Sequence, residues 1–437
     1  MVSKTGLLRA AVVLATLLCM LPMLVKTPVE YALLCAINGM ICAYAIMSYP
    51  KEPFSSHKIV HIFILSFFLV ANALQFIKHE TIVSLIIHFD DDDYILLQLV
   101  LLFILAVYNI SYIAIRQRRK FNLPKKTPRT RNFNYLVLLL ISVCSFAVVL
   151  FVHRDNLLTL FFRGIIDEIS QVEEEESVVQ SLLIGKFIRP MAFVSYMIAR
   201  LGGLDLKHRL PLFIVMIFSI FPTSLARNAV AMYWIPVFIV NFKVLRKKYI
   251  FPVVLIFGLF FIFPLFDNFR YFDGTFTSVV SWDYLVSMNF DASQMFMTVQ
   301  KWDVVTWGKQ LLGVLLFFVP RSLWPGKPVG SGAAIADMQG AFGNVSMPWW
   351  GEGYINFGYL GVLLFTLILS FATARLDVEY WKRGCPGKYS ILKKIFYYFF
   401  VGSLFFILRG DLLSSYAFLV GTILSVLFVY KISSKRI

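Results

Sequence analysis

The sequence predicts an all-α polytopic membrane protein, and two observations carry this prediction. Of its 437 residues, 59% are hydrophobic and only 15% are charged, which is too apolar for a soluble globular domain. Apolar runs of about 18 residues recur along the chain, and each is long enough to cross a bilayer as a helix. Stretches such as 136–152 lack the alternating pattern of a transmembrane β-strand.

The apolar runs begin close to the N-terminus. Run 10–25 follows Lys4 and Arg9, but it has no small-x-small cleavage pattern and a second run follows at once, so we expect a transmembrane helix and not a signal peptide. Twelve spans are predicted in all, at residues 10–25, 29–48, 58–77, 94–115, 134–153, 180–200, 210–223, 228–242, 249–266, 353–373, 390–408 and 412–430.

Basic residues predict the orientation of these spans. The loop 116–131 carries eight Lys and Arg residues and no acid, which is typical of a cytoplasmic loop. Counting from it puts both termini on the cytoplasmic side, and the acid-rich loops 79–93 and 154–179 on the outer side. The net charge of +16 is therefore a topology signal, and no nucleic-acid partner is expected.

Two short segments need separate treatment. Residues 210–242 must form two short spans around Arg227, because one long tilted helix would flip the chain and place the basic loop 375–388 outside. Residues 309–319 are apolar but too short to span, so we expect an interfacial or re-entrant helix there.

Three regions follow from this topology. Residues 1–266 form nine spans with short loops, 267–352 form a large outer segment, and 353–437 form the last three spans. The outer segment holds seven acids, five bases and six of the eight tryptophans. We expect the chemistry of the protein to lie in it.

Several arginines are predicted in or near the outer leaflet. A guanidinium binds phosphate oxygens bidentately and keeps its charge when partly desolvated, so the group predicts a diphosphate site. The alternative is that these side chains only reach toward headgroups or pair with acids, as Arg409 could with Asp411. The candidates are Arg189, Arg227, Arg270, Arg321 and Arg409.

A general base in the outer segment must be a carboxylate, because no histidine follows His208. Glu352 is the first candidate, since it lies just before a predicted span, where the positive end of the helix favours an anion. The alternative is that it only caps the helix. Asp291 is the second candidate.

The tryptophans of the outer segment allow two interpretations. Sugars stack on aromatic rings, which makes Trp324, Trp349 and Trp350 candidates for sugar binding, but tryptophan also concentrates at membrane interfaces. The chain contains no P-loop, G-x-S-x-G, H-E-x-x-H or C-x-x-C motif. Nucleotide hydrolysis, serine hydrolase and common zinc chemistries are therefore not expected, and neither is a cofactor or a metal.

Two motifs resemble a known family. The run Val319-Pro-Arg-Ser-Leu-Trp-Pro-Gly-Lys-Pro328, followed by Gly351-Glu-Gly-Tyr-Ile-Asn-Phe-Gly-Tyr-Leu-Gly361, is similar to the signature of Wzy-type O-antigen and oligosaccharide repeat-unit polymerases. Arg270 after the ninth span and the Arg409-Gly pair before the last also match that pattern. The likeness covers residues 265–415, and the first 200 residues match only in hydropathy.

The resemblance implies a fold similar to the C superfamily of glycosyltransferases and a site on the outer face of the bacterial inner membrane. It implies an enzyme that joins polyprenyl-diphosphate-linked oligosaccharide units into an O-antigen-like surface polysaccharide. The donor and the acceptor are both lipid-linked, so two cationic patches are expected. A chain-length regulator protein is a further expected partner, beside membrane lipids.

Two other functions stay open. An O-antigen ligase shares this architecture, but such ligases are expected to carry a histidine in the large outer loop, which this chain lacks. A flippase of lipid-linked sugars would also use arginines within the membrane, but it would arrange them along a path that reaches both faces.

Overall fold

A computed structural model describes residues 26–82, 87–118, 132–155, 157–161, 182–265, 282–340, 345–383 and 390–435. Regular structure in these ranges is helical apart from one pair of two-residue strands, β1 (Asn132–Phe133) and β2 (Ser434–Lys435), which run antiparallel. The predicted all-α class is confirmed.

Eight of the described helices are long and apolar enough to cross a membrane. They coincide with eight of the twelve predicted spans. They are α3 (Val29–Met47), the continuous helix α4–η1–α5 (Ser56–Phe63, Ile64–Val70 and Ala71–Lys78), α6 (Asp91–Arg118), α7 (Tyr135–Val152), α11 with η4 (Leu206–Ser219 and Pro222–Ser224), α19 with η9 (Trp349–Asp377 and Val378–Arg383), α20 (Ile391–Arg409) and α21 (Leu412–Ser433).

Twelve full-length spans are not confirmed. The run 10–25 lies outside the described residues, and three predicted spans are shorter or broken helices. The first is η3 (Leu182–Ile188) with α10 (Pro190–Leu201), the second is α12 (Arg227–Asn241), and the third is α13 (Ile250–Phe257) with η6 (Gly258–Ile262) and α14 (Phe263–Leu265). Prolines explain part of this, since a proline has no N–H for the helical ladder: Pro190 starts α10 and Pro236 lies inside α12.

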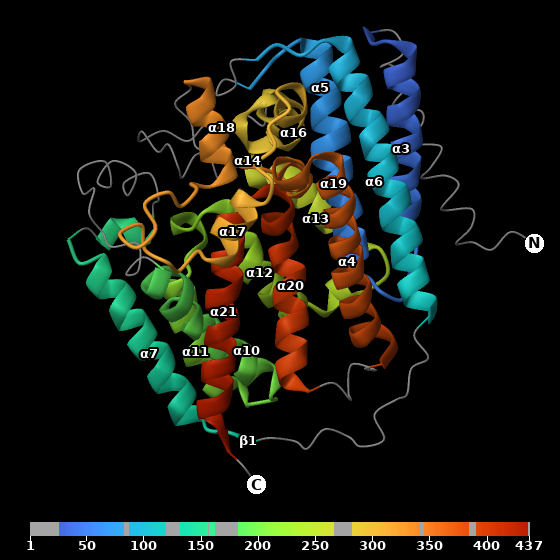
Figure 1. Ribbon diagram of the computed structural model, residues 1–437. Coiled ribbons are helices and arrows are strands. Elements are labelled where there is room, and N and C mark those ends of the chain that lie inside the picture. The colour runs from blue at the N-terminus through green and yellow to red at the C-terminus, as the bar shows by residue number, and fades with distance from the viewer. Residues whose placement is uncertain are drawn as a thin grey trace, which may run out of the picture.

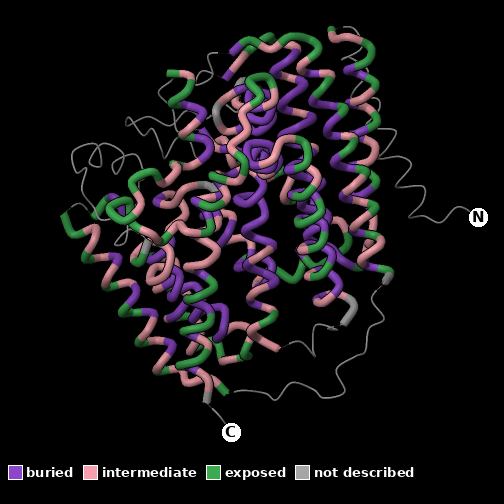
Figure 2. Tube along the Cα trace, viewed as in Figure 1, coloured by how far each residue is buried: buried purple, intermediate pink, exposed green. Residues whose placement is uncertain are grey.

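The helices form two groups with α20 between them (Figure 1). In one group α6 packs on α3 and α19, and in the other α7, α10 and α11 pack together, with α21 against α10. Helix α20 contacts α12 on one side and α4 on the other. Buried residues concentrate where the helices face one another, and exposed residues follow their outer sides (Figure 2). Exposed apolar side chains on those sides, such as Ile110 and Leu136, suit a hydrocarbon surrounding.

The helix ends predicted to share the basic side do lie together. The β1–β2 pair joins the start of α7 to the end of α21. The guanidinium of Arg200, at the end of α10, donates to Asn241 Oδ1 at the end of α12 at 3.2 Å. Helices α11 and α12 therefore form the predicted hairpin, and the single tilted helix is excluded.

Helix α19 contains a reversal that the sequence did not predict. Phe357 (φ −149°, ψ 25°) and Gly358 (φ 58°, ψ −145°) are not helical and separate a short helix from the long one. The two parts touch at Gly353 and Gly361: a Cβ on Gly361 would lie 1.8 Å from the carbonyl oxygen of Gly353. The expected span from residue 353 is therefore wrong at its start, because residues 349–356 form a separate helix folded back on it.

The outer segment is built into one end of the bundle. Its described helices are η7 (Trp282–Val286), η8 (Met288–Phe290), α16 (Ala292–Lys301), α17 (Lys309–Leu315) and α18 (Ser331–Gln339). Helix α16 packs on α6, α19 and η1 (Figure 1). The Gln75 side-chain amide of α5 donates to the carbonyl oxygens of Leu285 at 3.3 Å and Phe290 at 3.0 Å. The segment is thus a packed layer on the helix ends.

Candidate functional site

Arg409 and Asp291 form an ion pair between the end of α20 and the start of α16. Arg409 Nη2 lies 3.2 Å from Asp291 Oδ1, and the Arg409 side chain is 23% exposed, whereas that of Asp291 is 1% exposed. Arg409 Nε also donates to the carbonyl oxygen of Asn289 at 2.9 Å. Burial raises the pKa of Asp291, and the charge of Arg409 opposes this rise. One candidate cation and one candidate base are thus brought together.

Glu352 is buried and accepts two hydrogen bonds. Its Oε2 accepts from Ser331 Oγ at 2.8 Å, and its Oε1 accepts from the backbone N–H of Leu412 at 2.9 Å. These donors lie at the N-termini of α18 and α21, so one carboxylate joins three helix starts, its own included. Glu352 therefore bonds to the starts of two other helices, and as a base it would have to exchange one of these donors for a substrate hydroxyl.

Asp411 is a further carboxylate close enough to Glu352 for their charges to interact, and we call these two side chains the carboxylate cluster. Its Oδ1 accepts from the N–H of Leu413 at 3.0 Å, as the N-cap of α21, and its Oδ2 accepts from the N–H of Gly332 at 3.0 Å. Burial raises the pKa of Asp411, and these amide donors oppose the rise. Gly330 packs against the carboxylate, since a Cβ there would lie 2.6 Å from Asp411 Oδ2. The anion is held by backbone amides at two helix starts.

Arg321 and Lys327 bring two positive charges into one loop. Arg321 Nη1 donates to the carbonyl oxygen of Lys327 at 2.9 Å, and Lys327 Nζ donates to the carbonyl oxygens of Phe317 at 2.6 Å and Val319 at 2.9 Å. Arg321 is exposed. Partial burial and the neighbouring charge of Arg321 lower the pKa of Lys327. The first resemblance motif is therefore a closed, cationic loop.

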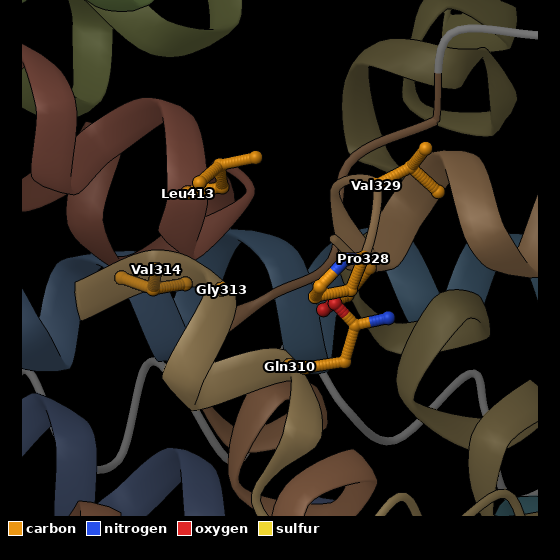
Figure 3. A pocket seen from close by; sticks show the side chains of 7 residues that line it. Gln310, Gly313, Val314, Pro328, Val329 and Leu413 are labelled. Carbon is orange, nitrogen blue, oxygen red and sulfur yellow. The ribbon is translucent and has the colours of Figure 1, made fainter. Parts of the chain in front are cut away.

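A shallow surface depression lies between this loop and the carboxylate cluster. Figure 3 shows it between α17 and the loop, with the Gln310 side chain directed toward Pro328. Ser331, which donates to Glu352, is part of its wall. The lining residues are Gln310, Gly313, Val314, Pro328, Val329, Ser331 and Leu413.

The candidate sugar-binding tryptophans differ in exposure. Trp350 is 0% exposed and its indole N–H donates to Thr366 Oγ1 at 3.2 Å. Trp349 is half-buried and donates to the carbonyl oxygen of Phe365 at 3.0 Å. Both hold the α19 reversal together. Trp324 is half-buried in the cationic loop. Because Trp350 is fully buried, it has no ring face open to a sugar in this conformation.

The remaining arginines do not join this cluster. Arg189 Nε donates to the carbonyl oxygen of Ser219 at 2.7 Å and its Nη2 to Ser224 Oγ at 3.1 Å, so its neighbours belong to the α11–η4 turn. The backbone of Arg227 starts α12, but its side chain lies outside the described structure. Arg270 lies outside the described residues. The five candidate arginines therefore do not form one described site.

Sequence reasoning missed Asn289, Lys327 and Ser331 as partners in this region, and it considered Asp411 only as a partner of Arg409. It also missed Asp377, at the opposite end of α19. Its carboxylate accepts from the backbone N–H groups of Ser56 and His57 and from the hydroxyls of Tyr112 and Tyr397, at 2.7–3.1 Å. An acid next to a predicted apolar span was a signal that could have singled it out.

Fold and hydropathy define the chain as an all-helical protein with helices suited to a membrane. No protein-family model, curated protein or solved structure matches it.

Proposed function

We propose that the protein is a membrane glycosyltransferase of the Wzy type, which polymerises polyprenyl-diphosphate-linked oligosaccharide units on the outer face of the bacterial inner membrane. One observation carries the proposal. The cationic loop around Arg321, the Glu352–Ser331 contact and the Arg409–Asp291 pair come from separate parts of the chain, and all belong to the segments that pack at one end of the bundle.

The proposed reaction needs the two kinds of group found there. The bond between the donor sugar C1 and its diphosphate oxygen breaks, and a bond forms from C1 to the acceptor hydroxyl oxygen. Negative charge develops on the departing polyprenyl diphosphate, where fixed arginines stabilise it. The hydroxyl proton passes to a carboxylate, for which Asp291 and Glu352 remain the candidates.

The burial of Asp291 and the exposure of Arg321 both support this chemistry. A charge–charge interaction is stronger where water is excluded, and Asp291 lies beneath a partly exposed Arg409. A substrate that binds Arg409 would therefore come close to a carboxylate that is already desolvated. Arg321 presents its guanidinium at the surface, where a second lipid-linked unit could be bound.

Deletion of the gene tests the proposal. A polymerase predicts loss of long polymer while single capped repeat units persist. Loss of all attached sugar would instead indicate a ligase, and accumulation of the lipid-linked unit on the cytoplasmic face would indicate a flippase. The purified protein in liposomes with lipid-linked repeat units should then produce a ladder of products, and absence of a ladder with competent substrate would contradict the proposal.

A further inference from the structure

Two arginines meet at the end of the bundle that carries β1, away from α16 and α18 (Figure 1). Arg200 lies in the last turn of α10, and Arg246 lies in the short helix η5 (Lys243–Arg246). The Nη2 atoms of both donate to the carbonyl oxygen of Val240, at 3.3 Å and 3.0 Å. A guanidinium has more N–H donors than such contacts use. Two positive charges are thus held side by side by an uncharged oxygen, and both can still bind a ligand.

Two further bases join this pair from other helices. Arg209 of α11 and Arg200 both act through their charges on the hydroxyl of Tyr196. Lys394 of α20 lies close enough to Arg246 for their charges to repel each other. We call the side chains of Arg200, Arg209, Arg246 and Lys394 the four-base cluster.

No acid of the described ranges neutralises this cluster. None of its four side chains lies within ion-pair distance of a carboxylate there. This holds for Asp205 too, although it is the N-cap of the helix that carries Arg209. The Nε of Arg209 is buried and has no hydrogen-bond partner among the described residues. Because like charges held together repel one another, an anion bound here would stabilise the cluster.

The helices that carry the cluster expose apolar side chains beside it. Phe238 and Phe242 of the α12 end are 44% and 54% exposed, and their ring centroids lie 6.0 Å apart. On α11, which is long and apolar enough to cross a membrane, Leu206 and Leu210 are 68% and 51% exposed. An inorganic anion would use the positive charges alone. A phospholipid would use both features, with its phosphate on the bases and its acyl chains on the apolar side chains.

We propose that the four-base cluster binds the headgroup of an anionic phospholipid, with the phosphate at Arg200 and Arg246 and the acyl chains along Phe242 and Phe238. The planar fork of a guanidinium matches phosphate oxygens, and basic pockets between membrane helices suit such headgroups. The bound lipid would join α10, α11 and η5 to α20, which lies between the two groups of helices. This site is separate from the carboxylate cluster and does not depend on the proposed function.

Titration of phosphatidylglycerol into the full-length protein in a neutral detergent tests this proposal, with native mass spectrometry as the readout. Phosphatidylglycerol should bind about tenfold or more tightly than phosphatidylcholine, because only the former has a net negative charge. Arg209→Gln and Arg246→Gln should each weaken its binding by about tenfold, since a hydrogen bond to a charged group is worth about that factor. Arg209→Gln should leave the fold intact, because no hydrogen bond from its Nε to a described residue is lost.

Matched controls separate this site from general attraction by charge. Lys207→Gln removes an exposed base from the same helix as Arg209, but residues two apart on a helix point to different sides. It should bind phosphatidylglycerol as the native protein does. Phe242→Asn should weaken phosphatidylglycerol, whereas Leu157→Asn, which changes a 56% exposed leucine of η2 (Leu157–Leu160), should not.

Several outcomes would overturn the proposal. Equal binding of the two phospholipids would do so, as would equal losses in Arg209→Gln and Lys207→Gln. Displacement of the bound lipid by millimolar inorganic phosphate would indicate a site for a free anion instead. Displacement by a poly-glutamate peptide would indicate an acidic protein partner, and either displacement would reject the phospholipid as the occupant.

Discussion

Arg409 Nη2 lies 3.2 Å from Asp291 Oδ1, so the turn between α20 and α21 is joined to the start of α16 by a partly buried ion pair. The same guanidinium reaches the carbonyl oxygen of Asn289, 120 residues away in sequence. Removing one partner of a buried pair leaves the other charge uncompensated, which commonly costs about 3–5 kcal/mol.

The first prediction concerns this pair. Arg409→Gln should lower the free energy of unfolding by several times more than the double variant Arg409→Gln/Asp291→Asn does, because the double variant leaves no buried charge alone. Thermal unfolding of the protein in detergent measures both. If the loss of stability in the double variant equals the sum of the losses in Arg409→Gln and in Asp291→Asn, the two groups do not interact.

A pH dependence should accompany Arg409→Gln. Burial raises the pKa of Asp291 and Arg409 opposes the rise, so without Arg409 the pKa in the folded protein should lie still higher above that of the unfolded chain. The folded state then binds the proton more tightly. Stability of the variant should increase as pH falls and be lost as pH rises through the folded-state pKa, and unfolding midpoints across pH will record this slope.

The second prediction concerns Glu352. Glu352→Gln should lower stability by about 1–3 kcal/mol, because an amide cannot accept from both Ser331 and Leu412 with its two terminal atoms. If Glu352 is also the base, polymer formation per folded molecule should fall by about 10²–10⁴. Ser331→Ala is the matched control, since it removes one donor and no proton acceptor. Equal activity per folded molecule in both variants would leave Glu352 a capping residue.

The third prediction concerns the reversal in α19. Gly361→Ala should destabilise the protein by about 1–3 kcal/mol or more, because its Cβ would overlap the carbonyl oxygen of Gly353. Gly326→Ala is the control, since nothing lies within 4 Å of a Cβ at that position. Unfolding temperatures of the two variants should differ clearly, and similar values would mean that the close approach is absent.

The fourth prediction concerns topology. Ser331 is 2% exposed and is unsuitable for labelling, whereas Ser322 is exposed in the cationic loop. In a background without the five native cysteines, Ser322→Cys should react with an impermeant thiol reagent in intact spheroplasts. Ser390→Cys, before α20, should react only after the membrane is opened. The reverse pattern would overturn the predicted orientation.

Hydropathy and charge were sufficient to predict the all-α class of the protein and which helix ends lie on the same side of the bundle. Apolar length is a property of each segment taken alone, so α3, α6, α7, α20 and α21 could be located from the sequence. Basic loops report on which ends share a side, and the α11–α12 hairpin followed from that count, as the Arg200–Asn241 contact bears out.

Tertiary structure alone decided which of the candidate residues meet. Arg409 could pair with Asp411 near it in sequence, yet its ion pair is with Asp291. Helix α16 packs against α6 and α19 at one end of the bundle, and backbone amides at two helix starts hold Asp411. The α19 reversal depends on a positive φ at Gly358 and on the close approach of two glycines. Such contacts depend on how helices rotate and pack against one another, which a hydropathy profile does not record.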